Sequence, residues 1–315
     1  MRILETYNHD TAEWLNQRFR DENGNVIFGG SDAPALMGAS PYTTREDLFV
    51  NKLVPPVVQP EKPAFRRGNL LEPVLVSEAA NFLGIPIISP KVIYREGRFS
   101  INPDGVDNEE NPTVLVECKT TTRYSVQSSN DLPIEWLWQG WAQQLVIGAP
   151  VWFSVLDRDQ RFSVVQMPTN VDAAFALTEQ AEIMGRMIES GEPSPKDLNK
   201  FTADQIAKIY KATPTSIEVP AETIDLILAL EETRAARIET EKLETALRNE
   251  IARLLLNNEI GTLNGTKLVS WKEQGGRKSL DATALKRDHP ELVSQYEKVG
   301  SPFRVLRTHY KEGNK

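Results

Sequence analysis

Asp104, Glu117 and Lys119 have residue types and a spacing that could hold a divalent cation. Asp104 stands in a Pro-Asp-Gly turn, and Glu117 and Lys119 flank Cys118 at the end of an apolar run. Two carboxylates at hydrogen-bond range repel each other unless a cation lies between them, and hard oxygen ligands suit Mg²⁺. A lysine beside such an ion can orient or activate a water molecule, or stabilise a charged transition state. The three residues therefore predict a Mg²⁺ site with hydrolytic chemistry.

Two short strands are expected to bring these residues together. The apolar run over residues 114–116 is rich in β-branched valine and is bounded by an Asn-Pro pair, which predicts a buried strand over residues 113–119. Side chains alternate along a strand, so Glu117 and Lys119 project to one face, about 6.6 Å apart. A preceding strand over residues 98–102 would lead to Asp104 and pair antiparallel with the first. The alternative is a surface hairpin that carries a solvated Glu/Lys pair.

A long amphipathic helix is expected over residues 64–83. Its apolar stripe comprises Leu70, Leu71, Val74, Leu75, Ala79 and Phe82. Because the stripe must pack on the sheet that carries Asp104, Glu72 could be a third acidic group at the site. A Glu before a Pro in a helix is more often a solvated residue. Arg66 and Arg67, at the start of this helix, are placed for contacts with phosphates.

A second strong helix is expected over residues 133–147, where Gln139 and Gln143 share a face. Three tryptophans recur in it at helical spacing, which is more often a core pattern than a platform for stacking bases. They are Trp136, Trp138 and Trp141. Beyond this helix we expect a hairpin over residues 151–156 and 161–167 and a closing helix over residues 173–190.

The N-terminal region carries a second polar cluster. A helix over residues 11–20 would present Trp14 and Arg18 on one face, and a Gly-Gly pair precedes Ser31 and Asp32, either of which could cap the next helix. A plain loop followed by an N-cap would explain this pattern. A phosphate site with Arg18 and Ser31 as donors would also explain it, because paired glycines let a backbone approach a ligand closely.

The composition limits the classes of protein to consider. The chain has 315 residues and a formal net charge of −8, which argues against a uniformly basic nucleic-acid binder. Residues 261–315 carry 11 basic and 6 acidic residues and thus a local charge of +5. A single cysteine excludes disulfides within the chain and cysteine-rich metal sites. Neither a signal peptide nor an apolar run of about 18 residues is present, so we expect a soluble protein of the cytoplasm.

The last third of the chain is expected to form an accessory module. Residues 222–257 predict a charged helix of about 54 Å, whose apolar seam suits contact with another helix, within the chain or between subunits. The seam comprises Leu243, Leu247, Ile251 and Leu254. A hairpin turn at Asn264-Gly265, two short helices and a last strand over residues 303–308 would complete a small α+β module. The expected segments are a domain over 1–198, a connector over 199–220, a helix over 221–258 and a basic module over 259–315.

The order of the motifs carries a family resemblance. The motifs are W-x-x-x-R at 14–18, GGSDA at 29–33, RRGNLLEP at 66–73, PDG at 103–105, ECK at 117–119 and Q-x-x-x-Q at 139–143. In this order they resemble the YqaJ-like viral recombinase family, the phage-type relatives of lambda exonuclease within the PD-(D/E)xK superfamily. The resemblance covers about residues 10–190. It implies an α/β fold with a restriction-endonuclease-like core, in which helices flank a central mixed sheet.

Carried over residue by residue, the resemblance implies a role for each matching position. The ligands of two Mg²⁺ ions, which Mn²⁺ could replace, would be Asp104, Glu117, the Cys118 backbone carbonyl and Glu72. The other catalytic residues would be Lys119, Gln139 and Gln143. The contacts with DNA and its 5′-phosphate would be Trp14, Arg18, Ser31, Arg66 and Arg67, with Arg20 as an alternative to Arg18.

The activity implied by the resemblance is that of a phage or prophage recombination exonuclease. It would degrade double-stranded DNA ends from 5′ to 3′ in the cytoplasm of a bacterial host. It would act as a homo-oligomer, with a trimer expected, and a single-strand annealing protein would be its partner. Phosphodiester hydrolysis by metal ions needs no protein nucleophile. One alternative is an endonuclease with the same metal site, whose C-terminal module selects the target. Another is a non-catalytic DNA-binding or scaffold protein, against which the intact acidic-lysine set argues.

Overall fold

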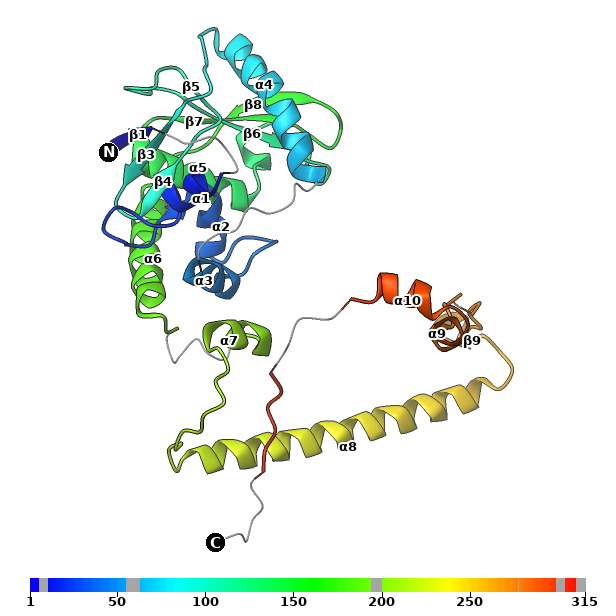
Figure 1. Ribbon diagram of the computed structural model, residues 1–315. Coiled ribbons are helices and arrows are strands. Elements are labelled where there is room, and N and C mark those ends of the chain that lie inside the picture. Colours follow the sequence, from blue (N-terminus) through cyan, green and yellow to red (C-terminus); the bar gives the residue numbers. More distant parts are fainter. Residues whose placement is uncertain (6–10, 55–62, 194–199, 277, 299–303, 310–315) are drawn as a thin grey trace. The chain divides into compact units, whose positions relative to one another are not determined.

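The computed structural model describes residues 1–5, 11–54, 63–193, 200–276, 278–298 and 304–309. The chain forms two compact units, Met1–Lys211 and Ala212–Lys315 (Figure 1). No helix among the described residues is long and apolar enough to cross a membrane. All residues predicted for the metal and phosphate sites belong to the first unit.

The sheet that carries the predicted metal ligands has four strands in the order β5-β6-β7-β8. The strands are Gly105–Val106, Leu115–Thr120, Val151–Leu156 and Phe162–Gln166. β5 and β6 are antiparallel, β6 and β7 are parallel, and β7 and β8 are antiparallel. The sheet is therefore mixed, and with helices packed on it the predicted mixed α/β fold is confirmed.

A second sheet of four strands has the order β1-β3-β4-β2. The strands are Arg2–Glu5, Val92–Glu96, Phe99–Ile101 and Phe28–Gly29. β4 pairs antiparallel with β3 and parallel with β2, so the expected pairing of residues 98–102 with the strand of Glu117 is wrong. After β4 the chain turns at Pro103 and enters the first sheet as β5, which does pair with β6. Asp104 therefore lies where the chain crosses from one sheet to the other.

Helix α4, Pro63–Leu83, packs on β6 and β7 of the first sheet. The apolar stripe predicted for this helix is only partly correct. Leu75 and Ala79 are buried as expected, but the buried face also includes Val76, and three residues of the stripe are exposed. The exposed residues are Leu70, Val74 and Phe82. The sheet covers a face of α4 that is rotated toward Val76, and periodicity alone cannot fix that rotation.

Helix α5, Ile134–Ile147, lies between the two sheets and packs on β3 and β4 as well as on β7. Trp136 and Trp141 are buried, and the ring of Trp138 meets that of Trp141 edge-on at 5.0 Å between centroids, which confirms the core interpretation of the tryptophans. Packing is close here, since a Cβ on Gly140 would lie 2.4 Å from the sulfur of Met167 and would force that side chain to move.

Shorter helices complete the first unit. They are α1 (Ala12–Gln17), η1 (Gly30–Asp32), α2 (Ala33–Leu36), α3 (Arg45–Leu53), η2 (Ser129–Asp131), α6 (Val171–Ser190) and α7 (Ala203–Ile209). A reciprocal capping box between Thr44 and Asp47 begins α3. α7 falls in the segment expected to be a connector and packs on α3, where Gln205 Nε2 donates to Asp47 Oδ1 at 2.6 Å.

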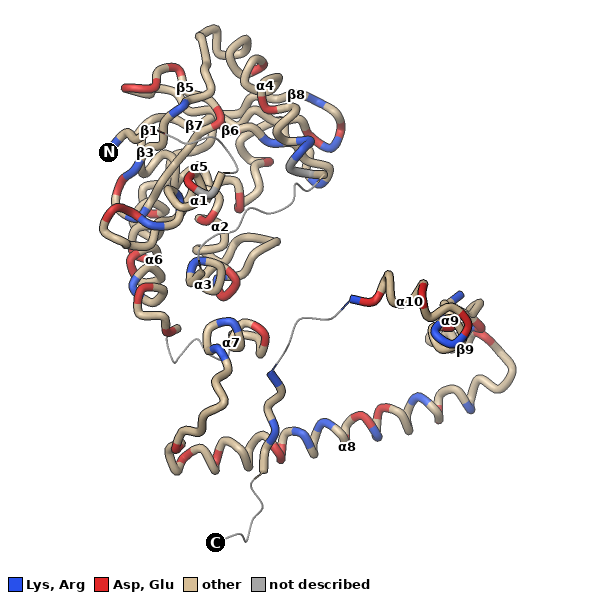
Figure 2. Tube along the Cα trace, in the orientation of Figure 1, with Lys and Arg blue, Asp and Glu red and all other residues tan. Residues whose placement is uncertain are grey.

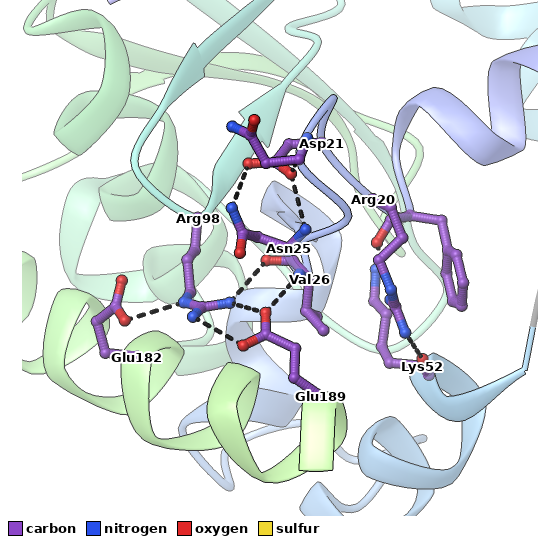
Figure 3. A network of polar contacts seen from close by, with 10 residues as sticks. Arg20, Asp21, Asn25, Val26, Lys52, Arg98, Glu182 and Glu189 are labelled. Atoms are coloured by element: carbon purple, nitrogen blue, oxygen red, sulfur yellow. Dashed lines mark hydrogen bonds and ion pairs between the residues drawn. The ribbon is translucent and has the colours of Figure 1, made fainter. Parts of the chain in front are cut away.

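A polar network fastens the segment before β2 to helix α6 (Figure 3). The guanidinium of Arg98 donates to Glu189 Oε1 at 2.5 Å and to the Val26 carbonyl at 3.3 Å, and its Nε lies 3.0 Å from Glu182 Oε2. Glu189 also accepts from the Val26 amide at 2.8 Å. A Cβ on Gly185 would lie 2.4 Å from Arg98, so α6 has no space for a larger residue there. The network holds in place the chain that leads to the Gly-Gly-Ser segment.

The second unit consists of α8 (Thr223–Leu255), β9 (Ile260–Leu263), β10 (Thr266–Ser270), α9 (Ala282–Asp288) and α10 (Pro290–Tyr296). Charged residues recur along the whole of α8 (Figure 2). Among them, Arg237 forms an ion pair with Glu241, and Arg248 forms one with Glu244. The hairpin predicted at Asn264-Gly265 is confirmed, with both turn residues at positive φ.

The apolar seam of α8 and the last expected strand of this unit can both be compared with the sequence-based expectation. The four seam residues Leu243, Leu247, Ile251 and Leu254 are 61%, 52%, 46% and 68% exposed. The expected strand over residues 303–308 is not formed by its described part, residues 304–308, because no strand of the described chain pairs with it. Instead, Thr308 Oγ1 donates to Glu231 of α8 at 2.5 Å.

Candidate active site

Asp104 lies beside Glu117 as predicted. Gly105 of β5 is opposite Val116 of β6, so the preceding residue Asp104 meets the middle of β6, where its Oδ2 accepts from the Cys118 amide at 2.7 Å. Burial raises the pKa of Asp104 well above its ordinary value, and the charge of Glu117 raises it further. Asp104 therefore sits in a position where its negative charge is unfavourable unless a cation is near.

Glu117 is the centre of a buried hydrogen-bond network and is only 4% exposed. Its Oε1 accepts from Lys119 Nζ at 2.6 Å and from Gln139 Nε2 at 2.5 Å, and its Oε2 accepts from Gln143 Nε2 at 2.5 Å. The predictions that Glu117 and Lys119 share a face of β6, and that the two glutamines share a face of α5, are therefore confirmed. The buried network excludes the alternative of a solvated surface hairpin.

Lys119 is held as a cation in this network. Its Nζ donates to Gln139 Oε1 at 2.8 Å as well as to Glu117. Burial by itself lowers the pKa of Lys119, but the charges of Glu117 and Asp104 outweigh that effect and raise the pKa above its ordinary value. The amine consequently remains protonated at neutral pH.

Cys118 points to the opposite face of β6, where its Sγ lies 3.9 Å from the backbone carbonyl of Glu72. Burial raises the pKa of the Cys118 thiol, so the thiolate needed for nucleophilic chemistry is disfavoured. His289 and His309 belong to the second unit, and His9 lies outside the described residues. No described residue of the first unit is therefore a histidine, the usual base of serine- or cysteine-type catalysis.

Glu72 projects from α4 toward the two other carboxylates. Burial raises the pKa of Glu72, and the charge of Glu117 adds to the shift. Two cavities meet at Glu72, Asp104 and Glu117, since these three residues border both. The larger cavity, of about 840 Å³, is also lined by Tyr42, Thr43, Arg67, Gly68, Asn69, Leu75, Cys118, Lys119 and Thr120. The smaller, of about 210 Å³, is also lined by Trp14, Arg18, Gly30, Ser31, Ile101, Asn102, Gln139 and Gln143.

The groups around the smaller cavity are suited to a hard cation. Within the described residues, no three His, Cys, Asp or Glu side chains converge closely enough to form a metal cluster by themselves. The oxygens Gln143 Oε1 and Asn102 Oδ1 are buried and have no hydrogen-bond partner in the described chain. Carboxylate and amide oxygens are the ligands that Mg²⁺ prefers, with water completing its shell. The donor set therefore fits Mg²⁺, with Asp104 and Glu117 as the residues that would hold it.

Arg18 and Ser31 border the smaller cavity, as the phosphate hypothesis requires. The Arg18 guanidinium lies over the Trp14 ring, 4.5 Å from its centroid, and a Cβ on Gly29 would be 3.1 Å from an Arg18 nitrogen. Burial lowers the pKa of Arg18, against the opposing effect of Asp32. Arg18 forms no ion pair with a described residue, although the charges of Asp32, Glu117 and Asp104 act on it.

The capping role expected of Ser31 or Asp32 is wrong in detail. The residue at the N-cap of η1 is Gly29, and Asp32 Oδ2 accepts from the Gly29 amide at 2.8 Å. Asp32 does stand at the N-cap of α2, but its side chain makes no capping bond there. The carboxylate thus closes a tight turn at the Gly-Gly pair instead of capping the helix that follows, and the Ser31 hydroxyl is exposed beside it.

The other predicted cations lie in different places. Arg20, the alternative to Arg18, donates instead to the carbonyls of Phe19 and Lys52, at 3.0 and 2.8 Å. Arg67 borders the larger cavity, whereas Arg66 is exposed and lines neither cavity. The structure thus brings Arg18 and Arg67 to the cavities and leaves Arg20 and Arg66 away from them.

Three residues of this region were missed from the sequence. Asn102 lines the smaller cavity two residues before Asp104, a spacing that could have suggested it. Tyr42 is 77% exposed at the larger cavity, and its hydroxyl accepts from Arg123 at 3.0 Å. Lys52 is buried beneath the Gly-Gly turn, and nothing in its local sequence distinguishes it from a surface lysine.

Comparison with known proteins gives matches only among solved structures. No family model and no curated protein sequence matches the chain. An alkaline exonuclease (LHK-Exo) from Laribacter hongkongensis is similar at a TM-score of 0.46, with 16% identity over 57% of this chain and 93% of that chain. The same exonuclease in complex with dAMP gives a TM-score of 0.45 with the same identity and coverage. A phage related exonuclease from Haemophilus somnus 129PT gives 0.39, with 9% identity over 53% of this chain and 95% of that chain. Because these TM-scores are low, the case for a function depends on the residues of the site itself.

Proposed function

We propose that the chain is a Mg²⁺-dependent deoxyribonuclease of the lambda exonuclease type, which degrades double-stranded DNA ends from the 5′ side. The observation that carries the proposal is the meeting of two cavities at Glu72, Asp104 and Glu117, with the Lys119 amine hydrogen-bonded to Glu117. Metal-dependent phosphodiester hydrolysis needs an acidic cluster and a cationic group at one point of a cleft open to the substrate.

Each residue of the cluster would have a distinct role. Asp104 and Glu117 would hold Mg²⁺ together with the Cys118 carbonyl, and Glu72 would lie near a second ion. When bound, Mg²⁺ would activate a water molecule and stabilise the leaving oxygen. The raised pKa of Lys119 makes its amine a poor general base, so Lys119 would stabilise the charge that develops on the phosphate.

Gln139 and Gln143 would hold Glu117 in its orientation. Each donates an amide hydrogen to one Glu117 oxygen, from successive turns of the buried helix α5. Ligands fixed by surrounding hydrogen bonds keep a metal site in its productive geometry. The two glutamines are therefore expected to support metal binding in addition to lining the cavity.

The smaller cavity supports an exonuclease over an endonuclease. It joins the Ser31 hydroxyl and the Arg18 guanidinium, which has no ion pair among the described residues, to the three carboxylates. A guanidinium that lacks a carboxylate partner is a strong receptor for phosphate. A terminal 5′-phosphate held there would place the adjoining nucleotide at the carboxylates, whereas an internal phosphate would need no such receptor.

The test is an assay of end-labelled linear duplexes that carry either a 5′-phosphate or a 5′-hydroxyl, against closed circular DNA, with and without Mg²⁺. We expect cleavage of linear DNA only with Mg²⁺, faster on the 5′-phosphate, and loss of cleavage in Lys119→Ala. Efficient cutting of closed circles would favour the endonuclease. Absence of cleavage on every substrate, together with binding of duplex DNA, would favour the non-catalytic alternative.

The remaining parts of the proposal concern assembly. We propose a homo-oligomer, with a trimer expected, and docking of a single-strand annealing protein by the second unit. Residues 261–315 carry a net charge of +5, which suits contact with phosphates or with an acidic partner. Light scattering of the purified protein gives the oligomeric state directly.

A further inference from the structure

Lys52 occupies an unusual position for a lysine near the end of a short helix. It lies in the last turn of α3, and its side chain is only 11% exposed. Its Nζ lies 2.8 Å from Asp32 Oδ2, donates to the Ile27 carbonyl at 2.9 Å, and is 3.5 Å from the Arg18 carbonyl. A buried ammonium needs such partners, and these three belong to the segments that form the phosphate side of the smaller cavity.

The carboxylate that Lys52 binds is also the one that could disable Arg18. Asp32 has the largest electrostatic effect of any carboxylate on Arg18. A guanidinium and a carboxylate form a strong bidentate pair when no other group competes for the carboxylate. In this structure both partners are otherwise engaged: Asp32 binds Lys52 and the Gly29 amide, and Arg18 stacks on Trp14.

We propose that Lys52 is a positioning residue that neutralises Asp32 and thereby keeps the Arg18 guanidinium available for a terminal phosphate. This rests on the proposed function, of which it explains one part. Removal of the Lys52 amine leaves Asp32 as a half-buried carboxylate with a single amide donor. Arg18 could then compensate it, because a Cβ on Gly29 would lie 3.1 Å from an Arg18 nitrogen and 3.7 Å from Asp32 Oδ2, and an Arg18–Asp32 pair would close the receptor from inside.

Lys52 could also have a purely mechanical role, in which its hydrogen bonds only hold the segments of Arg18, Ile27 and Asp32 together. A double variant separates this mechanical role from the proposed electrostatic one. Lys52→Met removes the charge and should allow Arg18 to pair with Asp32. Adding Asp32→Asn to Lys52→Met removes the competing carboxylate while an amide oxygen can still accept from Gly29. The charge argument predicts that the second substitution restores phosphate recognition, whereas a mechanical role predicts no restoration.

The measurement is the ratio of dissociation constants for 5′-hydroxyl and 5′-phosphate forms of one fluorescent oligonucleotide duplex, in EDTA to prevent cleavage. We expect a ratio of about ten or more for the wild type, close to one for Lys52→Met, and recovery of at least half of the logarithmic loss in Lys52→Met/Asp32→Asn. The exposed Lys91→Met is the matched control and should leave the ratio unchanged. Lys52→Gln, which keeps an amide donor for the Ile27 carbonyl, replaces Lys52→Met if the latter fails to fold. A ratio that stays at the wild-type value in Lys52→Met, or in Lys52→Gln where that variant takes its place, overturns the inference.

A crystal structure of Lys52→Met makes the inference independent of nuclease activity. The expected result is an Arg18 guanidinium within ion-pair distance of Asp32 and displaced from Trp14. An Arg18 that stays on Trp14 overturns the inference even if the wild-type protein degrades DNA. Conversely, an Arg18–Asp32 pair in the variant, together with no cleavage by the wild type, supports the role of Lys52 and refutes the nuclease proposal.

Discussion

Replacement of Glu117 by alanine tests whether the buried network exists as described. The change removes the acceptor of three donors at once, from Lys119, Gln139 and Gln143. We expect the variant to lose Mg²⁺-dependent cleavage and also to lose stability in EDTA, where no metal contributes. A surface Glu/Lys pair would give the first effect at most, because exposed pairs contribute little to stability.

The size of the loss follows from the burial of the partners. Breaking a buried ion pair by removing one member costs about 3–5 kcal/mol. The Lys119 side chain is 21% exposed and keeps some hydration, and removal of one charge also relieves the repulsion of Asp104, so both effects reduce the cost. We expect a net loss of about 2–4 kcal/mol, which leaves a domain of ordinary stability folded at 25 °C. For a unit of this size the loss corresponds to a fall in Tm of about 4–16 °C.

The assay is thermal denaturation in EDTA near pH 7.5, followed by far-UV circular dichroism, with urea denaturation to give the free energy of unfolding. Glu179→Ala on the exposed face of α6 is the matched control, and a surface change of this kind should shift the free energy of unfolding by no more than about 0.5 kcal/mol. A Glu117→Ala variant as stable as the control would refute the reasoning, since it would mean that the three donors are hydrated and the network is not buried.

Three further predictions follow from the same geometry. Asp104→Asn should raise Tm in EDTA. Since the folded-state pKa of Asp104 is raised, the gain should be absent near pH 3, below the unfolded pKa, and should grow as the pH rises from the unfolded toward the folded pKa. A gain that does not depend on pH, in a series of melting curves, would contradict this. Gly105→Ala should lower the free energy of unfolding by about 1–3 kcal/mol and should also lower the rate of cleavage, because a Cβ there would lie 2.6 Å from Ile87 and displace the strand after Asp104. A near-normal urea denaturation curve would refute the clash. Deletion of residues 212–315 should leave Mg²⁺-dependent cleavage in the first unit, but it should weaken binding of duplex DNA and reduce the salt dependence of that binding. Loss of all catalysis in a folded truncation would mean that the second unit completes the site.

Local sequence features predicted most of the elements but not their partners. The alternation on residues 113–119 was sufficient to place Glu117 and Lys119 together, because side-chain direction along a strand is a local property. The strand over residues 98–102 was found as β4 yet assigned to the wrong sheet, since pairing depends on the course of the chain after Pro103. The face of α4 was misplaced for the same reason, because which side of an amphipathic helix is covered depends on the sheet it meets.

The residues that were missed act through contacts between distant segments. Lys52 is a polar residue at the end of an ordinary helix, and only the fold places its amine against carbonyls about 25 and 34 residues away in the chain. Asn102 is recognisable only once Asp104 is known to face a cavity. In both cases the sequence contains the residue, but the chemistry of its surroundings comes from tertiary structure.

The electrostatics of the site favour a cation over an empty network of carboxylates. Burial raises the pKa of Asp104 and of Glu72, and the charge of Glu117 opposes the ionisation of both. In the described chain, Lys119 is the one ammonium hydrogen-bonded to Glu117. Lys119 and Arg18 do not cancel the repulsion among the three carboxylates, since the pKa of Asp104 and of Glu72 stays raised, and a divalent ion would relieve it. Binding such an ion would lower the pKa of Asp104, release a proton wherever Asp104 is protonated beforehand, and stabilise the first unit at the same time. Affinity for Mg²⁺, proton release and thermal stabilisation are thus three consequences of one arrangement, and each depends on the same carboxyl group of Asp104.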